Sequence, residues 1–147
     1  MTPPQKRIWY YTIDDEGVVW HDKVPFDDPD LIAFFLKNLE PYSGGKFRVL
    51  CQGEECIISC QDIPYVVQEI DLPFLIFPGG YQEALDPTTL WVGKKNVLYC
   101  KVREGRFSAR FNRKSYLELA KSIQQDPKSG QYYLVIDKKK YPIKVSP

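Results

Sequence analysis

The sequence holds little of the chemistry that marks most enzymes. It has one histidine, His21, one methionine and four cysteines among 147 residues. Histidine is the side chain whose ordinary pKa lies nearest neutral pH, so a single copy leaves few ways to build an acid–base pair. The sequence therefore favours a protein that is not an enzyme and predicts no cofactor.

Long hydrophobic runs are also missing. No apolar stretch approaches the roughly 18 residues needed to cross a bilayer. The start, "MTPPQKRIWYY", lacks the apolar segment of a secretory signal. We therefore expect a cytoplasmic protein without a membrane partner, in which thiols stay reduced rather than forming a disulfide.

The composition predicts a well-packed core. Hydrophobic residues make up 44% of the chain and aromatic residues 14%. A chain of this length buries enough surface to fold without a disulfide or a metal. We expect residues 1–147 to form a single compact domain.

Charge is divided along the chain although the net charge is only +1. Residues 1–87 contain 6 Lys/Arg and 15 Asp/Glu, a balance of −9, whereas residues 88–147 contain 14 and 4, a balance of +10. An asymmetry of this kind bears on partners rather than on fold. It leaves open nucleic-acid binding through the basic half, a solvated basic lobe, or a basic lobe that complements the acidic lobe within the chain or in a homo-oligomer.

A repeat with an offset of 85 residues predicts the architecture. "LIAFFL" falls on "YLELAK" and "GKFRVL" falls on "GQYYLV" when the chain is shifted by that amount. Each copy reads as hairpin, helix and hairpin. We therefore predict an α+β fold made of two β-hairpin–helix–β-hairpin units, about 8–60 and about 96–147, joined by additional antiparallel strands over 61–95.

The two predicted helices begin with similar signals. Asp27 and Asn112 are placed to cap the first turns. Apolar residues then recur at helical spacing and predict the buried faces: Leu31, Phe34, Phe35 and Leu39 in the first copy, and Tyr116, Leu119, Ala120 and Ile123 in the second.

Three of the four cysteines lie in "CQGEECIISC", residues 51–60. We expect a hairpin with the four-residue loop "QGEE", in which Cys51 opposes Cys56 and Phe47 opposes Cys60. Alternation then puts these residues on one apolar face. The spacing is not that of paired zinc knuckles, so the cysteines read as buried small residues and no metal site is predicted.

Two further groups could bind or react. His21 lies in "VVWHDKV" beside Asp22, but neighbours in a strand point to opposite faces, so Asp22 is badly placed to orient it. Lys138, Lys139 and Lys140 are expected at the tip of the last hairpin, where copy one has Gly53-Glu54-Glu55. With nearby tyrosines, they could contact phosphates.

Several short motifs resemble families of unknown function. "LIAFFLKNLEPYSGGKF", "CQDIPYVV" and "EALDPTTL", within about residues 10–100, resemble DUF4505. The layout through Asp62-x-Pro64-Tyr65-Val66 is also similar to the bacterial family DUF1285. The second resemblance implies an α+β fold built from repeated motifs, with a signalling or binding role.

These observations leave three functional hypotheses. The first is a non-enzymatic binding or interaction module for a small ligand or a protein. Its surface would be the junction near Asp62, Pro64 and Tyr65, or the basic lobe. The second is a nucleic-acid-binding protein that uses the basic lobe. The third is a hydrolase or metal enzyme that uses His21 and nearby carboxylates.

Overall fold

The computed structural model describes residues 7–147, which form two short α-helices and sixteen short strands in four sheets. The helices are α1 (Pro29–Asn38) and α2 (Arg113–Ala120). The α+β prediction is therefore confirmed. No helix of the described chain is long and apolar enough to cross a membrane.

The largest sheet contains six strands in the order β3-β2-β1-β6-β5-β4. Their bounds are β1 (Ile8–Ile13), β2 (Val19–His21), β3 (Val24–Pro25), β4 (Glu40–Pro41), β5 (Phe47–Cys51) and β6 (Glu54–Cys60). The second sheet has the order β11-β12-β13-β7, with β7 (Tyr65–Val67), β11 (Trp91–Val92), β12 (Leu98–Val102) and β13 (Phe107–Phe111).

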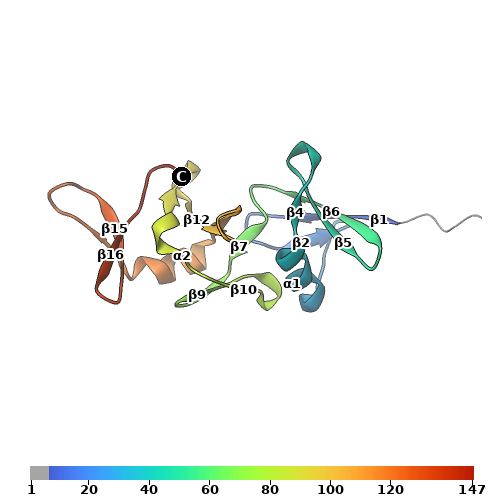
Figure 1. Ribbon diagram of the computed structural model, residues 1–147, viewed down its shortest axis with the longest axis horizontal. Coiled ribbons are helices and arrows are strands. Elements are labelled where there is room, and N and C mark those ends of the chain that lie inside the picture. The colour runs from blue at the N-terminus through green and yellow to red at the C-terminus, as the bar shows by residue number, and fades with distance from the viewer. Residues whose placement is uncertain (1–6) are drawn as a thin grey trace, which may run out of the picture.

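Two three-stranded sheets complete the fold. One is formed by β8 (Glu69–Asp71), β9 (Phe74–Ile76) and β10 (Gln82–Ala84), the other by β14 (Ile123–Gln125), β15 (Tyr132–Ile136) and β16 (Lys139–Pro142). Four 3₁₀ turns lie between strands: η1 (Ser43–Gly45), η2 (Pro78–Gly80), η3 (Pro87–Thr89) and η4 (Lys94–Asn96). Figure 1 shows an elongated molecule with α1 and the six-stranded sheet in one half and β15 and β16 at the opposite end.

The predicted tandem repeat is not confirmed. Each helix is followed by a three-stranded meander, β4-β5-β6 after α1 and β14-β15-β16 after α2. The first meander joins the first hairpin because β6 runs parallel to β1. The second remains a separate sheet, and Lys144, just after β16, makes a single bridge to Trp91.

The connecting region also differs from the prediction of antiparallel strands alone. β8, β9 and β10 form an antiparallel meander, but β7 pairs in parallel with β13. Parallel neighbours cannot be joined by a tight turn, so β7 and β13 are brought together by a long excursion of the chain. This pair links the first half of the sequence to the second.

The cysteine hairpin has a tighter turn than predicted. Val49 opposes Cys56 and Phe47 opposes Ile58, with only Gln52 and Gly53 in the loop. Both loop residues have positive φ, 52° and 80°, the backbone of a two-residue turn that matches the twist of the strands. The register is displaced by two residues, which preserves the side-chain faces. The predicted apolar face is therefore retained.

The last hairpin differs from the prediction in the same way. Ile136 opposes Lys139, so the loop contains only Asp137 and Lys138, again with positive φ. Lys138 lies in the turn, whereas Lys139 and Lys140 begin β16. All three lysines are exposed.

The cap residues and buried faces of the helices differ in part from those expected. Asp28, not Asp27, caps α1 by accepting from the Leu31 amide, while Asn112 caps α2 as predicted. Phe34 and Tyr116 are exposed, although helical periodicity predicted them to be buried. In α1 the buried face consists of Ile32, Phe35 and Leu36, of which the periodicity selected only Phe35, and this leaves Phe34 on the exposed side.

The buried apolar residues form one continuous cluster that includes both helices and strands of all four sheets. Phe35 of α1 packs edge-on against Tyr11 of β1, with ring centroids 5.0 Å apart. Gly79 of η2 lies directly against the backbone of α1, where a Cβ atom would be 2.5 Å from the Pro29 carbonyl oxygen. The chain around η2 thus depends on a residue without a side chain.

Candidate functional site

The predicted site residue Tyr65 lies at the C-terminal end of α1. Its hydroxyl donates to the carbonyl oxygen of Leu36, and the Arg103 guanidinium donates to the carbonyl oxygen of Leu39. The last carbonyls of a helix have no partner within it, so Tyr65 and Arg103 supply what α1 lacks. Arg103 Nη1 also donates to the Tyr65 hydroxyl at 3.1 Å.

Carboxylates hold Arg103 from two sides. Its backbone N–H donates to Glu83 Oε1 at 2.8 Å, and its guanidinium lies 3.4 Å from Glu40 Oε1. Arg106 Nη2 binds the other oxygen of Glu40 at 2.5 Å. This hydrogen bond lowers the pKa of the Glu40 carboxyl. The guanidinium of Arg103 also lies over the Phe107 ring, 4.6 Å from its centroid.

Asp62 belongs to a second polar cluster at the same junction. One of its oxygens, Oδ2, accepts from the Tyr99 hydroxyl and from Arg110 Nη1, both at 2.7 Å. Arg110 Nη1 also lies 3.3 Å from Asp15 Oδ1. Burial, followed by the hydrogen bond to Asp62, raises the pKa of Tyr99 to about 12.

The structure therefore brings Asp62, Pro64 and Tyr65 to the junction between the halves, but not to one open surface. Pro64 and Tyr65 are buried, while Asp62 is exposed and already bound by two donors. Their contacts hold elements together. A ligand could reach only the carboxylate edge of Asp62 without a rearrangement.

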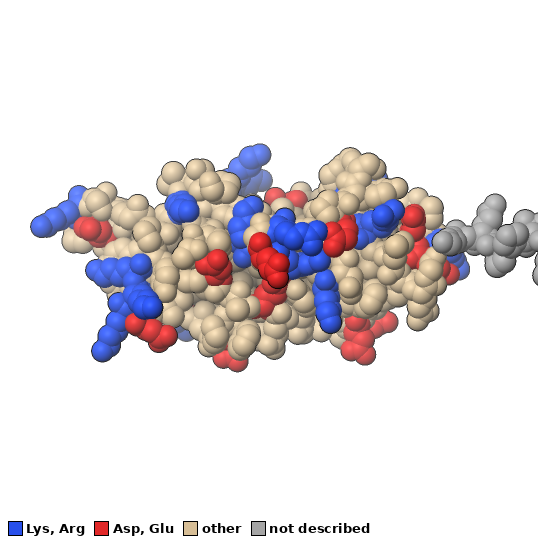
Figure 2. All heavy atoms as spheres, in the orientation of Figure 1, with Lys and Arg blue, Asp and Glu red and all other residues tan. Residues whose placement is uncertain are grey.

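The opposite charges of the two halves, which are evident from the sequence, partly form ion pairs with each other within the molecule. Five of the eight ion pairs among the described residues join an acid of the first half to a base of the second: Glu40–Arg103, Glu40–Arg106, Asp15–Arg110, Asp62–Arg110 and Glu69–Lys114. Figure 2 shows red and blue side chains lying against each other at the middle of the molecule. These ion pairs connect the two halves at their junction.

His21 lies on the inner face of the six-stranded sheet, among aromatic rings. Its ring stacks at a tilt on Tyr11, with centroids 4.9 Å apart, and its Nδ1 lies 3.0 Å from the Tyr10 carbonyl oxygen. Strand alternation was expected to place Asp22 badly for contact with His21, but Asp22 Oδ2 lies 3.4 Å from His21 Nε2. Asp22 has φ of 49° and belongs to a turn, where strand alternation does not apply.

Three of the four thiols lie in surroundings that keep them protonated. Burial raises the pKa of Cys56 to about 11 and those of Cys60 and Cys100 to about 12. A thiol with such a pKa is a poor nucleophile and a poor metal ligand at neutral pH. Within residues 7–147 no group of three or more His, Cys, Asp or Glu side chains could hold a metal ion.

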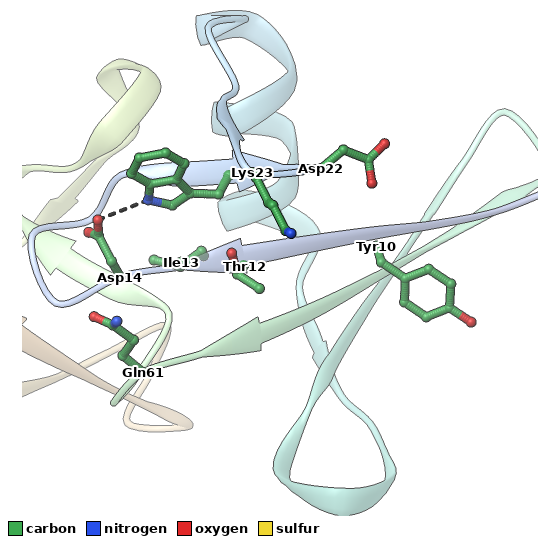
Figure 3. A pocket seen from close by; sticks show the side chains of 8 residues that line it. Tyr10, Thr12, Ile13, Asp14, Asp22, Lys23 and Gln61 are labelled. Atoms are coloured by element: carbon green, nitrogen blue, oxygen red, sulfur yellow. Dashed lines mark hydrogen bonds between the residues drawn. The ribbon is translucent and has the colours of Figure 1, made fainter.

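An open cleft of about 580 Å³ lies on the outer face of the six-stranded sheet (Figure 3). We call it the acidic cleft. It is lined by Tyr10, Thr12, Ile13, Asp14, Trp20, Asp22, Lys23 and Gln61. Asp14 is fixed in it, since Oδ2 accepts from the Trp20 indole at 3.0 Å and Oδ1 accepts from the amides of Glu16 and Val18.

The basic half carries a second hollow, which we call the tyrosine trough. One part of about 500 Å³ is lined by Val92, Asn96, Leu98, Tyr116, Ala120, Ile123, Tyr132 and Ile143. A second part of about 300 Å³ shares Val92, Tyr132 and Ile143 with it and continues along residues 129–131 to Lys144 and Val145. Tyr116 is 40% exposed and Tyr132 52% exposed, so both rings are available to a partner.

The rim of the tyrosine trough is basic. Lys94 and Lys95 are exposed and directly precede Asn96, and Lys144 lines the second part. No acidic residue lines either part. Sequence reasoning missed this site because the helical spacing of Tyr116 assigned that residue to the core, whereas it is exposed.

Two solved structures resemble this chain. A DUF1285 family protein from Silicibacter pomeroyi DSS-3 has a TM-score of 0.67 and 15% sequence identity, over 97% of this chain and 85% of that one. A DUF1285 family protein from Shewanella baltica OS155 has a TM-score of 0.58 and 11% identity, over 76% of this chain and 90% of that one.

These likenesses support the predicted resemblance to DUF1285 at the level of the fold. No family model matches the sequence, and no curated protein matches it. The resemblance to DUF4505 is not shown.

Proposed function

We propose that this chain is a non-enzymatic interaction module whose tyrosine trough binds an acidic protein segment carrying an apolar side chain. The observation that carries the proposal is the combination of Tyr116 and Tyr132 over an apolar floor with lysines at the rim. Aromatic anchors inside a polar rim are typical of protein-binding surfaces.

The shape of the trough supports a segment rather than a compact small molecule. Its two parts are joined beside Tyr132, so an extended chain could contact both. The floor residues Leu98 and Ile143 are buried, which offers a firm apolar surface to one inserted side chain. Lys94, Lys95 and Lys144 would then attract the flanking carboxylates.

The basic half retains positive charge for this role. Arg103, Arg106, Arg110 and Lys114 are engaged by acids of the first half. No ion pair among the described residues uses Lys94, Lys95 or Lys144. These lysines lie beside the trough, where their charge is available to a partner.

Fluorescence anisotropy with a labelled peptide of glutamates flanking one phenylalanine tests the proposal. We expect saturable binding that Tyr132→Ala weakens by at least about tenfold, the equivalent of about 1.4 kcal/mol. Tyr42→Ala is the matched control, because Tyr42 is 41% exposed but lies in the acidic half. It should leave binding unchanged.

A competition experiment separates this function from nucleic-acid binding. A single-stranded oligonucleotide with the same net charge as the peptide should compete weakly. If the oligonucleotide binds at least about tenfold more tightly, and its affinity falls steeply with salt, the basic half is a nucleic-acid surface and the proposed function is wrong.

A further inference from the structure

We propose that the lysine hairpin at the end of one copy docks in the acidic cleft of a second copy, so that the protein associates head to tail. The inserting element is the lysine tip, which consists of Lys138, Lys139 and Lys140. The receiving element is the acidic cleft on the outer face of the six-stranded sheet. This inference does not depend on the tyrosine trough.

The lysine tip is a protruding cation cluster that the described molecule does not neutralise by an ion pair. Lys138 occupies the turn, and Lys139 and Lys140 follow in β16, all exposed. No ion pair among the described residues uses any of the three. Lys140 extends over the Tyr133 ring, 4.9 Å from its centroid, which supports its stem against the sheet.

The acidic cleft has the complementary charge. Four acids line it or directly adjoin a lining residue in the sequence: Asp14, Asp15, Asp22 and Asp62. The bases there are Lys23 and Arg110, which leaves an excess of two negative charges. In Figure 3 the Asp22 carboxylate projects at the end of β2, on the rim of the hollow.

The cleft also offers aromatic surface to lysine side chains. Tyr10 is 62% exposed, and Trp20 is half-buried in the same lining. An ammonium group placed over such a ring is attracted by the electrons of its face, and lysine stems pack well on aromatic carbon. A cleft with carboxylates and aromatic rings therefore suits a lysine-rich hairpin better than it suits an acidic hairpin or a purely apolar hairpin.

The positions of the two elements determine the kind of assembly. The lysine tip lies at the β15–β16 end of the elongated molecule, whereas β1 and β2 belong to the opposite half (Figure 1). Figure 2 shows mainly blue side chains on the visible face of the β15–β16 end. A contact between two different surfaces is heterologous and produces chains or closed rings rather than an isologous dimer.

Charge-reversal variants test whether the lysine tip of a second copy occupies the acidic cleft. The tip variant is Lys138→Glu/Lys139→Glu/Lys140→Glu, and the cleft variant is Tyr10→Lys/Asp22→Lys. All five positions are exposed. A lysine at position 22 needs a left-handed backbone, which Lys23 and Lys138 already adopt in this chain. Far-ultraviolet circular dichroism confirms that each variant is folded.

Sedimentation velocity over a range of concentrations gives the readout. We expect the mass of the parent protein to rise with concentration at low salt, with association weakened at least about tenfold at 0.5 M NaCl by screening. Each variant alone should be monomeric. Mixing the two should restore association, because every tip then meets a cleft of opposite charge.

Two results would overturn the inference. One is a parent protein that stays monomeric at every concentration in low salt. This result would overturn the inference even if a lysine-rich peptide bound the acidic cleft, because the natural occupant would then be a molecule other than a second copy. The other is association that survives both reversals or is unaffected by salt. Loss of peptide binding in the tyrosine trough would not bear on either result.

Discussion

Arg103 donates a hydrogen bond to the hydroxyl of Tyr65, and both side chains end at carbonyl groups of the last turn of α1. One residue comes from β7 and the other from the turn between β12 and β13. The helix of the first half is thus capped by a side chain of the second half. Tyr65, a candidate binding residue from the sequence, thus contributes to the contact between the halves.

Replacing Tyr65 by phenylalanine tests this role. The change keeps the buried ring but leaves the Leu36 carbonyl and one Arg103 donor without their partner. We expect the free energy of unfolding to fall by about 1–3 kcal/mol, the usual cost of an unsatisfied buried group. Urea unfolding measures it. Tyr116→Phe, at an exposed tyrosine, should change stability by less than about 0.5 kcal/mol. Equal effects would contradict the capping role.

Alkaline pH should weaken the fold through the buried tyrosines. Burial raises the pKa of Tyr65 to about 12, and the pKa of Tyr99 is also raised to about 12. A tyrosine in the unfolded chain has a pKa of about 10, so the unfolded state releases its proton first. Stability from these groups is therefore complete below about pH 10 and is lost as pH rises toward 12.

Unfolding experiments between pH 8 and 12 check this window. The Tyr65→Phe and Tyr99→Phe variants should each lose less stability than the parent protein between pH 10 and 12. Tyr116→Phe serves again as the control and should follow the parent curve. A parent curve that stays flat to pH 12 would contradict the raised pKa values.

Thiol labelling should distinguish the cysteines. Cys56 and Cys100 are buried, and their thiols are protonated at pH 8 because burial raises their pKa values to about 11 and about 12. Cys60 has a pKa of about 12 for the same reason. We expect Ellman's reagent to label Cys51 first and the others only as the protein unfolds.

Two variants complete the labelling experiment. Cys51→Ser should remove the fast reaction, whereas Cys60→Val should keep it and should remain folded. All four thiols should react in urea, since no disulfide joins them in the described chain. Rapid labelling of Cys100 in native buffer would show that the core around it opens.

Adjacent glycines in η2 should respond differently to alanine. A Cβ atom on Gly79 would lie 2.5 Å from the Pro29 carbonyl oxygen and 2.7 Å from the Ala33 amide nitrogen, both backbone atoms of α1. Gly80 has a similar positive φ, 79°, but open space around it. We expect Gly80→Ala to cost about 1 kcal/mol from backbone strain, and Gly79→Ala clearly more. Thermal unfolding of both variants measures the difference.

The parts of the fold that could be predicted are those determined by nearby residues. Turn residues and apolar spacing indicated both helices, the cysteine hairpin β5–β6 and the lysine hairpin β15–β16. These elements could be predicted because they depend on local conformation. The hairpin registers were displaced by two residues because tight two-residue turns tolerate Gln52 and Asp137 in left-handed backbone. Local patterns could not reveal the parallel pairs β1–β6 and β7–β13, whose strands lie far apart in the sequence.

The candidate sites were harder to predict for the same reason. Tyr65 and Asp62 gained their partners only through the packing of one half on the other. Tyr116 had the spacing of a core residue, but no element covers its ring in the described structure, so it remains a wall of the trough. The lysine tip was the exception, because a charged hairpin end needs no tertiary contact to be exposed.

The parallel pairing of β1 with β6 also governs the order in which the chain can fold during synthesis. β1 leaves the ribosome before β6, so its parallel neighbour exists only after residues 54–60 have emerged. The cap of α1 waits longer still, until Arg103 is made. A chain synthesised only as far as β7 can contain the first sheet and the contact of Tyr65 with the Leu36 carbonyl, but it lacks the Arg103 donor for the Leu39 carbonyl.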